Sequence, residues 1–230
     1  ELDHLKDQFI SNVSHELRTP LTNIKLHLSL LEKRGPEVLP RYLPTLQRET
    51  ERLRKLIEDL LDLSRLQTQT GPLQRELYPL DDLLAEVLTV HAARADSKNL
   101  ALRHEPNADQ VRVPVEKAQM LQVFTNLIGN AVAYTPPGGH ATISSQLTSI
   151  GNAPGVNVYF ANDGPLIPAE DLPHLFRRFY RGRTAHDSGE PGTGLGLAIC
   201  REIVERHGGQ IDVTSEPQAG TRFSVWLPLN

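Results

Sequence analysis

Apolar residues in the first third of the chain recur at steps of three and four, the spacing of one face of an α-helix. Two such runs cover residues 2–33 and 38–67. Glycine and proline mark a turn between them, at Gly35, Pro36 and Pro40. The second run also repeats every seven residues, at Leu46, Leu53 and Leu60 and at Leu56 and Leu63. The pattern predicts an antiparallel helical hairpin, which pairs with a second copy in a dimeric four-helix bundle to bury both apolar stripes.

The pattern changes after the polar stretch 68–72, which ends in Gly-Pro, so we expect domains at 1–68 and 69–230. Helical patterns follow at 80–96, 115–133, 169–180 and 194–207. Strand patterns lie at 74–78, 100–104, 111–113, 141–150, 155–161, 210–215 and 221–228. The chain is therefore expected to be an α+β multidomain protein, whose second domain is an α/β sandwich with a mixed sheet and helices on one face. The polar stretch 181–192 is expected to be a mobile loop.

Composition limits the possible partners. The formal net charge of −4 gives no electrostatic reason to expect nucleic acid or an anionic membrane as a partner. No apolar run approaches the roughly 18 to 20 residues that span a bilayer. We therefore expect a cytoplasmic location, with any membrane contact made through an upstream segment outside this sequence. The single cysteine, Cys200, cannot form an internal disulfide and is expected to be a small buried apolar residue.

One histidine lies in a distinctive context on the first predicted helix. The run from Ser14 to Leu21 reads Ser-His-Glu-Leu-Arg-Thr-Pro-Leu, and it places His15 beside the apolar seam, where its ring can face solvent. A neutral imidazole is a nucleophile, and Glu16 can orient the ring or accept its proton. Thr19 is four residues further on and shares the face of His15, where its hydroxyl can position a water molecule. These three residues are the candidate catalytic group.

This octapeptide resembles the phosphoacceptor box of the sensor histidine kinases of two-component systems. The resemblance implies that His15 receives the γ-phosphoryl group of ATP and passes it to an Asp in the receiver domain of a response regulator. It also implies that Thr19 supports dephosphorylation of that regulator. The other histidines are expected to be surface or core residues, and His207 to complement a helix dipole at a helix C-terminus.

The second domain carries motifs that resemble the ATPase half of the same family. The run from Asn126 to Ala131 lies on a predicted helix, and Asn126 and Asn130 share one face of it. Amide oxygens suit Mg²⁺. By the resemblance, Asn130 is the Mg²⁺ ligand, Asn126 lies beside it, and Tyr134 also belongs to the nucleotide site.

The run from Asn162 to Pro168 resembles the family's adenine-binding turn, in which Gly164 takes part. The family has Asp at the position of Asn162 and Gly at the position of Leu166. The amide oxygen of Asn162 can still accept a hydrogen bond from the adenine amino group. Asp163 is a possible substitute, although strand alternation points its side chain elsewhere.

Two further motifs are expected to contact phosphates. The run from Leu175 to Arg181 resembles the family's phenylalanine box, where Arg178 or Arg181 can reach the transferred phosphate or order the lid at 182–193. The run from Gly192 to Leu197 opens a helix, whose N–H groups suit phosphate binding. Its spacing fits neither a dinucleotide-binding fingerprint nor a Walker loop. The residues assigned to the nucleotide here are Arg178, Gly192, Gly194, Leu195 and Gly196.

Taken together, the resemblance implies a histidine kinase core that uses ATP and Mg²⁺, forms a homodimer through its hairpin and engages a response regulator. Two alternatives stay open. Asn162, Leu166 and Ala133, where the family commonly has Lys, suggest a degenerate kinase that serves as a regulator-binding scaffold with weak ATP turnover. An ATPase akin to gyrase or heat-shock chaperones is the other, but those proteins lack a histidine-bearing hairpin.

Overall fold

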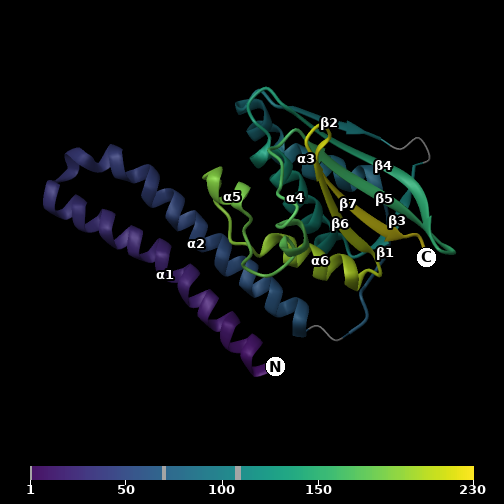
Figure 1. The fold of residues 1–230 in the computed structure, drawn as a ribbon, viewed down its shortest axis with the longest axis horizontal. Helices are drawn as coiled ribbons and strands as arrows, with labels where there is room; N and C mark the ends of the chain where they lie inside the picture. The colour runs from purple at the N-terminus through teal and green to yellow at the C-terminus, as the bar shows by residue number, and fades with distance from the viewer. Residues whose placement is uncertain (1, 69–70, 107–109) are drawn as a thin grey trace.

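The computed structural model describes residues 2–68, 71–106 and 110–230 (Figure 1). Its helices are α1 (Leu2–Arg34), α2 (Leu39–Thr68), α3 (Leu80–Ser97), α4 (Lys117–Tyr134), α5 (Arg183–Asp187) and α6 (Gly196–Arg206), with 3₁₀ turns η1 (Pro36–Val38) and η2 (Leu172–His174). Its strands are β1 (Glu76–Pro79), β2 (Ala101–Glu105), β3 (Arg112–Val115), β4 (His140–Ile150), β5 (Ala153–Asn162), β6 (Gln210–Glu216) and β7 (Gly220–Pro228).

The first two helices form the predicted antiparallel hairpin, whose closed end extends away from the rest of the molecule (Figure 1). The chain reverses at Gly35, whose φ of 79° lies in the left-handed region that favours glycine. The N–H of Gly35 donates to the carbonyl of Leu31 at 2.9 Å, which satisfies one of the last carbonyls of α1. A short 3₁₀ turn then leads directly into α2.

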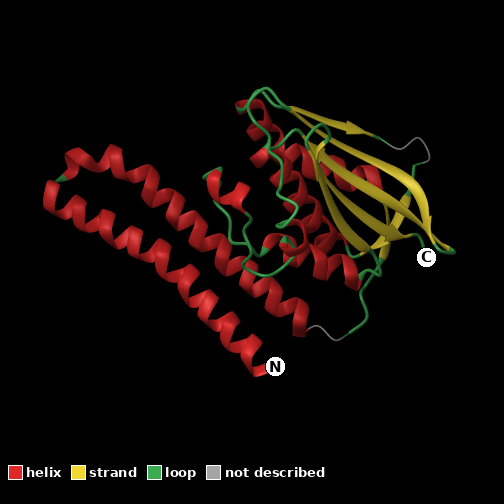
Figure 2. Cartoon of the chain, viewed as in Figure 1, coloured by secondary structure: helices red, strands yellow, loops and turns green. Residues whose placement is uncertain are grey.

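The C-terminal part is the predicted α/β domain with a mixed sheet. Five strands lie in the order β2-β4-β5-β7-β6, and the pairing is antiparallel except between β2 and β4. The helices α3, α4 and α6 cover one face of this sheet (Figure 2). The buried residues of β5 alternate along the strand, as a sheet covered on one face requires, at Val156, Val158 and Phe160.

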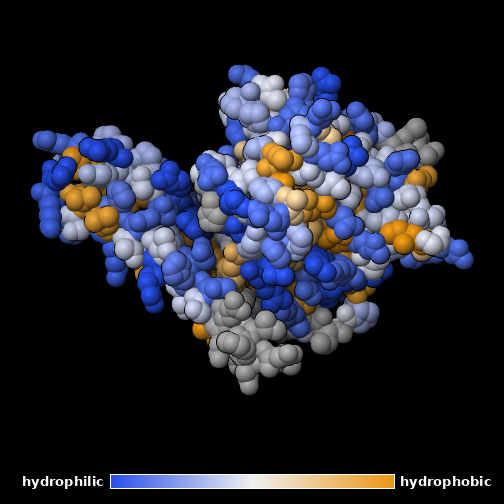
Figure 3. All heavy atoms as spheres, in the orientation of Figure 1, coloured by the Kyte–Doolittle hydropathy of each residue, from blue (hydrophilic) through white to orange (hydrophobic). Residues whose placement is uncertain are grey.

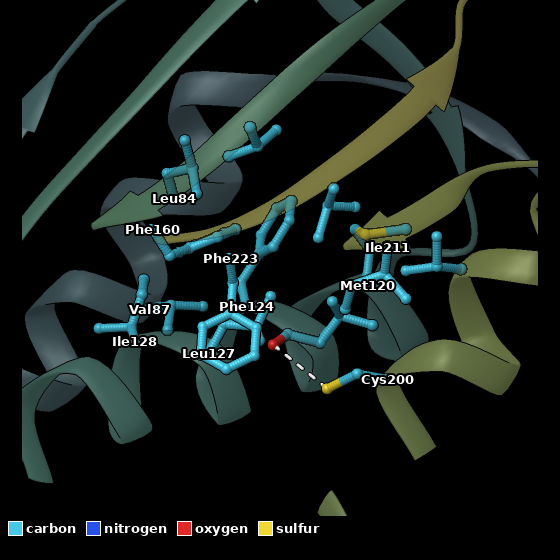
Figure 4. Close-up of a cluster of buried hydrophobic side chains, with 14 of the residues drawn as sticks. Leu84, Val87, Met120, Phe124, Leu127, Ile128, Phe160, Cys200, Ile211 and Phe223 are labelled. Atoms are coloured by element: carbon cyan, nitrogen blue, oxygen red, sulfur yellow. Dashed lines mark hydrogen bonds between the residues drawn. The ribbon is translucent and has the colours of Figure 1, made fainter. Parts of the chain in front are cut away.

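The core lies between the sheet and these helices (Figure 4). The rings of Phe124 on α4 and Phe160 on β5 pack with their centroids 5.7 Å apart. Cys200 on α6 is fully buried, and its thiol donates to the carbonyl of Val123. Burial raises the pKa of the Cys200 thiol to about 12, so this cysteine behaves as the expected buried apolar residue rather than a reactive thiol.

The prediction of a helix at 169–180 is wrong. Only the 3₁₀ turn η2 forms there, because Pro173 lacks the N–H that a continuing α-helix needs and Phe179 has a left-handed φ of 62°. The stretch 181–192, expected to be a loop, contains the short helix α5. The phenylalanine box is therefore an irregular segment rather than one face of a helix.

The C-terminal half of α2 lies against the α/β domain. Leu56, Leu63 and Leu66 are buried in the same cluster as the core residues of that domain. Polar contacts flank them: Gln122 on α4 donates to Asp62 at 2.6 Å, and Thr193 donates to Asp59 at 2.6 Å. The heptad positions at Leu56 and Leu63 are thus covered by this chain's own α/β domain.

Candidate functional site

A cavity of about 200 Å³ lies among α4, the end of β5, the segment after it and the start of α6. Eight of the residues predicted to bind nucleotide line it, namely Asn126, Asn130, Tyr134, Asn162, Gly164, Gly192, Gly194 and Gly196. The motifs that supply them are spread over about 70 residues of sequence and meet only in the fold. The cavity is the candidate nucleotide site.

Helix α4 presents its two asparagines to this cavity because its opposite side belongs to the core. Phe124 and Leu127 are fully buried, whereas Asn126 and Asn130 are partly exposed and line the cavity. The side-chain amide of Asn126 donates to the carbonyl of Gly196 at 3.5 Å, a long hydrogen bond that connects α4 to the start of α6. Asn130 is four residues further along the same face.

One end of the cavity is formed by Asn162 on β5 and Thr221 on β7, which are direct cross-strand neighbours. Asn162 is only 7% exposed, and its Nδ2 has no hydrogen-bond partner among the described residues. Asp163 points away from the cavity, as strand alternation predicted. Its carboxylate accepts hydrogen bonds from the backbone N–H and ring Nδ1 of His140, each at 2.9 Å. Asp163 therefore does not replace Asn162.

The glycine loop also lines the cavity, at Gly192, Gly194 and Gly196. Gly194 has a φ of 71°, and a Cβ there would approach the backbone of Phe179 to 2.7 Å, so the loop requires glycine at this position. Its carbonyl accepts a hydrogen bond from the N–H of Phe179 at 2.9 Å. Leu195, also predicted to bind nucleotide, does not line the cavity, because its side chain is fully buried in the core.

The two candidate arginines have different surroundings. Arg181 lines the nucleotide cavity, and its guanidinium donates to the carbonyls of Ala185 and Glu190 at 2.8 and 2.7 Å, which holds the lid segment together. Arg178 does not line that cavity. It lines a second cavity of about 300 Å³ together with His15 and Glu16.

The predicted phosphoacceptor lies in this second cavity. His15 is exposed on α1, and the hydroxyl of Thr19 donates to its backbone carbonyl at 3.3 Å. Glu16 forms an ion pair with Arg52 of α2 at 3.0 Å, so its carboxylate connects the two hairpin helices here. Tyr180 lines both cavities, which makes the phenylalanine box the wall between His15 and the nucleotide site.

Sequence reasoning did not assign Lys55 and Asp59 of α2, or Thr221 and Phe223 of β7, to the nucleotide cavity that they line. Asp59 is 2% exposed, and its carboxylate accepts from Thr193 at 2.6 Å and pairs with Lys55 at 3.1 Å. These partners offset the cost of burying the carboxylate. One sequence signal could have revealed Asp59: it is a charged residue that lies between Leu56 and Leu63 on the apolar face of its helix.

Position 133 is Ala where the family commonly has Lys, but the ammonium of Lys98 lies close to this position. The ammonium of Lys98 donates to the carbonyls of Val132 and Ala133 at 3.1 and 2.6 Å, and pairs with Glu190 at 3.4 Å. It thereby caps the C-terminal end of α4 and connects it to the lid. Burial raises the pKa of Tyr134 at that helix end, so its hydroxyl stays protonated near neutral pH.

His207 lies at the C-terminus of α6, as expected, but it does not complement the helix dipole as a cation. It is 1% exposed, its Nδ1 donates to the carbonyl of Ile203 at 2.8 Å, and its Nε2 accepts from the N–H of Glu116 at 3.1 Å. Burial lowers the pKa of His207, which favours the neutral ring. The residue instead joins the end of α6 to the start of α4.

No group of three or more His, Cys, Asp or Glu side chains in the described ranges has the arrangement of a metal site. A divalent cation in the nucleotide cavity would therefore depend on amide oxygens and on ligands brought by the nucleotide. Amide oxygen suits this chemistry, because Mg²⁺ takes oxygen ligands and keeps several of its waters. None of the helices described is both long and apolar enough to cross a bilayer.

Comparison with known proteins agrees with this arrangement. Residues 115–230 match the family described as histidine kinase-, DNA gyrase B-, and HSP90-like ATPase. Residues 5–69 match the His Kinase A (phospho-acceptor) domain. The chain therefore combines an ATPase-type domain with a phosphoacceptor hairpin, and it belongs to the sensor histidine kinase family.

Named relatives align along nearly the whole chain. It is 34% identical to the sensor histidine kinase WalK of Bacillus subtilis and 36% identical to the sensor protein SrrB of Staphylococcus aureus, over 99% of its length in both cases. It spans only 37% and 39% of those relatives.

Solved structures of histidine kinases share the fold. Acinetobacter baumannii AdeS has a TM-score of 0.73 at 27% identity, covering 94% of this chain and 98% of AdeS. Histidine kinase ThkA, solved in complex with the response regulator TrrA, has a TM-score of 0.78 at 26% identity, covering 97% of this chain and 61% of the matched chain.

Proposed function

We propose that this chain is the catalytic core of a sensor histidine kinase, with a phosphotransfer hairpin at 1–68 and an ATP-binding domain at 69–230. ATP binds in the cavity lined by Asn126, Asn130 and Asn162, and its γ-phosphoryl group is transferred to His15. The observation that supports this most is the pair of cavities, one lined by eight predicted nucleotide residues and one by His15, with Tyr180 in both.

Different residues of the cavity are proposed to bind the base and the phosphates of the nucleotide. Asn162 and Thr221 hold the base, and the glycine loop with the N-terminus of α6 holds the phosphates through backbone N–H groups. Asn130 contributes an amide oxygen to Mg²⁺, which neutralises charge on the phosphates when bound. Catalysis of phosphoryl transfer is then mostly positioning and charge neutralisation.

At the phosphoacceptor, a ring nitrogen of His15 forms a bond to the γ-phosphorus while the bond from that phosphorus to ADP breaks. Glu16 orients the ring or takes its proton, which requires its carboxylate to share or leave its ion pair with Arg52. The two cavities are distinct in this conformation, so the α/β domain moves relative to the hairpin to bring the phosphate to His15. The contact between Asp59 and Thr193 is one that this movement releases.

The hairpin is proposed to form a homodimer. Its large apolar residues remain two-fifths or more exposed at Leu21, Leu28, Ile57 and Leu61. A second copy buries these residues in a four-helix bundle. The phosphoryl group then passes to an Asp of a response regulator, as the ThkA–TrrA complex supports by analogy. Such a core works in the cytoplasm, with any membrane anchor in a preceding segment.

Substitution of Asn130 tests the nucleotide assignment. We expect Asn130→Ala to abolish transfer of label from γ-labelled ATP to His15, because a ligand for the phosphate-bound cation is lost. The matched control is Asn157→Ala on β5, which is outside the cavity and is expected to label normally. Sedimentation should show the same assembly for both variants. Normal labelling of Asn130→Ala would refute the assignment.

Substitution of Thr19 distinguishes the two proposed reactions, phosphorylation of His15 and dephosphorylation of the regulator. We expect Thr19→Ala to accept phosphate on His15 at a normal rate but to dephosphorylate a phosphorylated regulator at least about tenfold more slowly, since one positioned water is lost. Thr22→Ala, one helical turn further on with its hydroxyl on the carbonyl of Arg18, is the control. Unchanged regulator dephosphorylation in Thr19→Ala would show that this role is wrong.

A further inference from the structure

The base end of the nucleotide cavity presents a neutral amide where a carboxylate is absent. We propose that this cavity accepts nucleotides of 6-oxopurines, such as hypoxanthine, as well as those of adenine, because Asn162 can present either edge of its amide to the base. The inference rests on the proposed function, in which a nucleotide binds here. It goes further by assigning the range of bases that the site admits.

Asn162 has the burial and position of a base-reading residue. It is 7% exposed, it lines the cavity at the end of β5, and its Nδ2 has no hydrogen-bond partner among the described residues. A buried amide N–H without a partner is costly, so a ligand that accepts from it is favoured. Gly164 leaves room for this group, because a Cβ there would come within 2.5 Å of Nδ2.

Among the residues that the structure describes, no carboxylate beside Asn162 competes with its amide. Among the residues that line the cavity, Asp59 is the only acidic one, and it is engaged by Thr193 and Lys55 on the hairpin side. Asp163 is turned outward to His140. The neighbour of Asn162 across the sheet is Thr221, an uncharged residue whose hydroxyl shares a hydrogen bond with that of Ser215 at 2.9 Å. The base end is therefore neutral and can supply both donors and acceptors.

The two base types present opposite patterns to such a residue. Adenine offers a donor at its 6-amino group and an acceptor at N1, which match the amide oxygen and amide N–H respectively. Hypoxanthine offers an acceptor at O6 and a donor at N1, which match the same amide after a half-turn about its terminal bond. A carboxylate only accepts, so when it is held opposite position 6 it pairs with the adenine amino group but repels O6, and it can accept from the N1–H of hypoxanthine only if the base shifts. An amide at position 162 therefore discriminates less between adenine and hypoxanthine than a carboxylate at the same position would.

The test compares binding of ADP and IDP, which carry the two bases and cannot phosphorylate the chain. Titration calorimetry with Mg²⁺ present is performed on the whole 230-residue chain and on Asn162→Asp. We expect the wild-type dissociation constants for ADP and IDP to agree within about tenfold, and Asn162→Asp to widen their ratio by about tenfold to a hundredfold in favour of ADP. Asp163→Asn, whose side chain lies outside the cavity, is the control and should leave the ratio unchanged.

The outcomes separate this inference from the function beneath it. Wild-type chain that binds ADP but binds IDP more than about tenfold weaker would overturn the inference and leave ATP binding intact. The same holds for a ratio that Asn162→Asp does not change. Failure of both nucleotides to bind would overturn the proposed nucleotide site itself, and the inference with it.

Discussion

The hairpin and the α/β domain solve the problem of apolar burial differently. The α/β domain closes its core within one chain, and Phe124, Leu127 and Phe160 are at most 1% exposed. The hairpin leaves large apolar side chains in solvent, and its closed end carries apolar atoms at its surface (Figure 3). The exposed large apolar residues along the whole hairpin include Ile10, Leu21, Leu26, Leu28, Leu39, Leu43, Ile57 and Leu61. The sheet and helices of the domain bury most of its core, whereas much of the apolar surface of the hairpin stays uncovered.

One stretch of the hairpin already has a partner. The C-terminal half of α2 buries Leu56, Leu63 and Leu66 against the α/β domain, while Ile57 and Leu61 on the same helix stay exposed. The helix therefore has one face that packs on its own chain and another that the proposed dimer would bury. The proposed movement of the domain for phosphoryl transfer would uncover part of the first face, which would link catalysis to the stability of this docking.

The largest expected effect is loss of the domain core. Phe124→Ala should lower the free energy of unfolding of the α/β domain by about 3–5 kcal/mol, because it removes a fully buried ring and leaves a cavity. Urea unfolding followed by tryptophan fluorescence measures this, since Trp226 lies on β7. Leu26→Ala, at a hairpin residue that is 54% exposed, should change the value by less than about 0.5 kcal/mol. Equal losses in the two variants would remove the contrast between the regions.

The next effect concerns the exposed face of α2. Ile57→Lys combined with Leu61→Lys should raise the dimer dissociation constant at least about a hundredfold, because two charges would be buried in the bundle. Analytical ultracentrifugation at several concentrations gives the constant. Leu147→Lys on β4, at a residue of similar exposure, serves as control. A double variant that dimerises as well as wild type would place the interface elsewhere.

A smaller effect is expected at the docking contact. Thr193→Val keeps the side-chain shape but removes the hydroxyl that donates to buried Asp59, so docking should weaken by about 1–3 kcal/mol. Amide hydrogen exchange without nucleotide should then be faster across 56–66. Thr50→Val, where the lost hydroxyl contacts only the carbonyl of Leu46 on its own helix, should leave that exchange unchanged. Unaltered exchange in Thr193→Val would mean that the contact contributes nothing to docking.

The smallest effect is a pH dependence confined to the domain. Burial lowers the pKa of His207 below its ordinary value of about 6.5, so the unfolded chain takes up a proton that the folded chain resists. Its contribution to stability is complete above about pH 6.5 and is lost as the pH falls from there through the lowered pKa. His207→Gln should flatten this loss in unfolding experiments, whereas His140→Gln on the surface should keep it. A wild-type slope in His207→Gln would contradict the assignment.

Much of the nucleotide cavity could be predicted because its residues sit in short local patterns. Helical spacing places Asn126 and Asn130 on one face and glycines allow a close backbone approach, but the resemblance to the kinase family is what assigned both groups to the nucleotide. Lys55 and Asp59 could not be found in that way, since their place in the cavity depends on how α2 docks on a domain far along the chain. That docking is a tertiary event without a local pattern.

The assignment of Arg178 to the nucleotide site failed for a different reason. A helix at 169–180 would have carried Arg178 near its end, but the segment is irregular, and the left-handed Phe179 turns the chain between Arg178 and Arg181. Arg178 consequently lines the cavity of His15, and Arg181 lines that of the nucleotide. Propensity favoured the helix, but Pro173 and the hydrogen bond from Phe179 to Gly194 override it.

The most direct measurement is incubation of the chain with γ-labelled ATP and Mg²⁺, followed by acid and base treatment of the labelled protein. The account predicts label that is stable to base and lost in acid, as expected for phosphohistidine, in wild type but absent from His15→Gln. The variant should still bind ATP with unchanged affinity. Equal labelling of His15→Gln, or no label on wild-type chain saturated with nucleotide, would contradict the central claim that His15 receives the phosphoryl group.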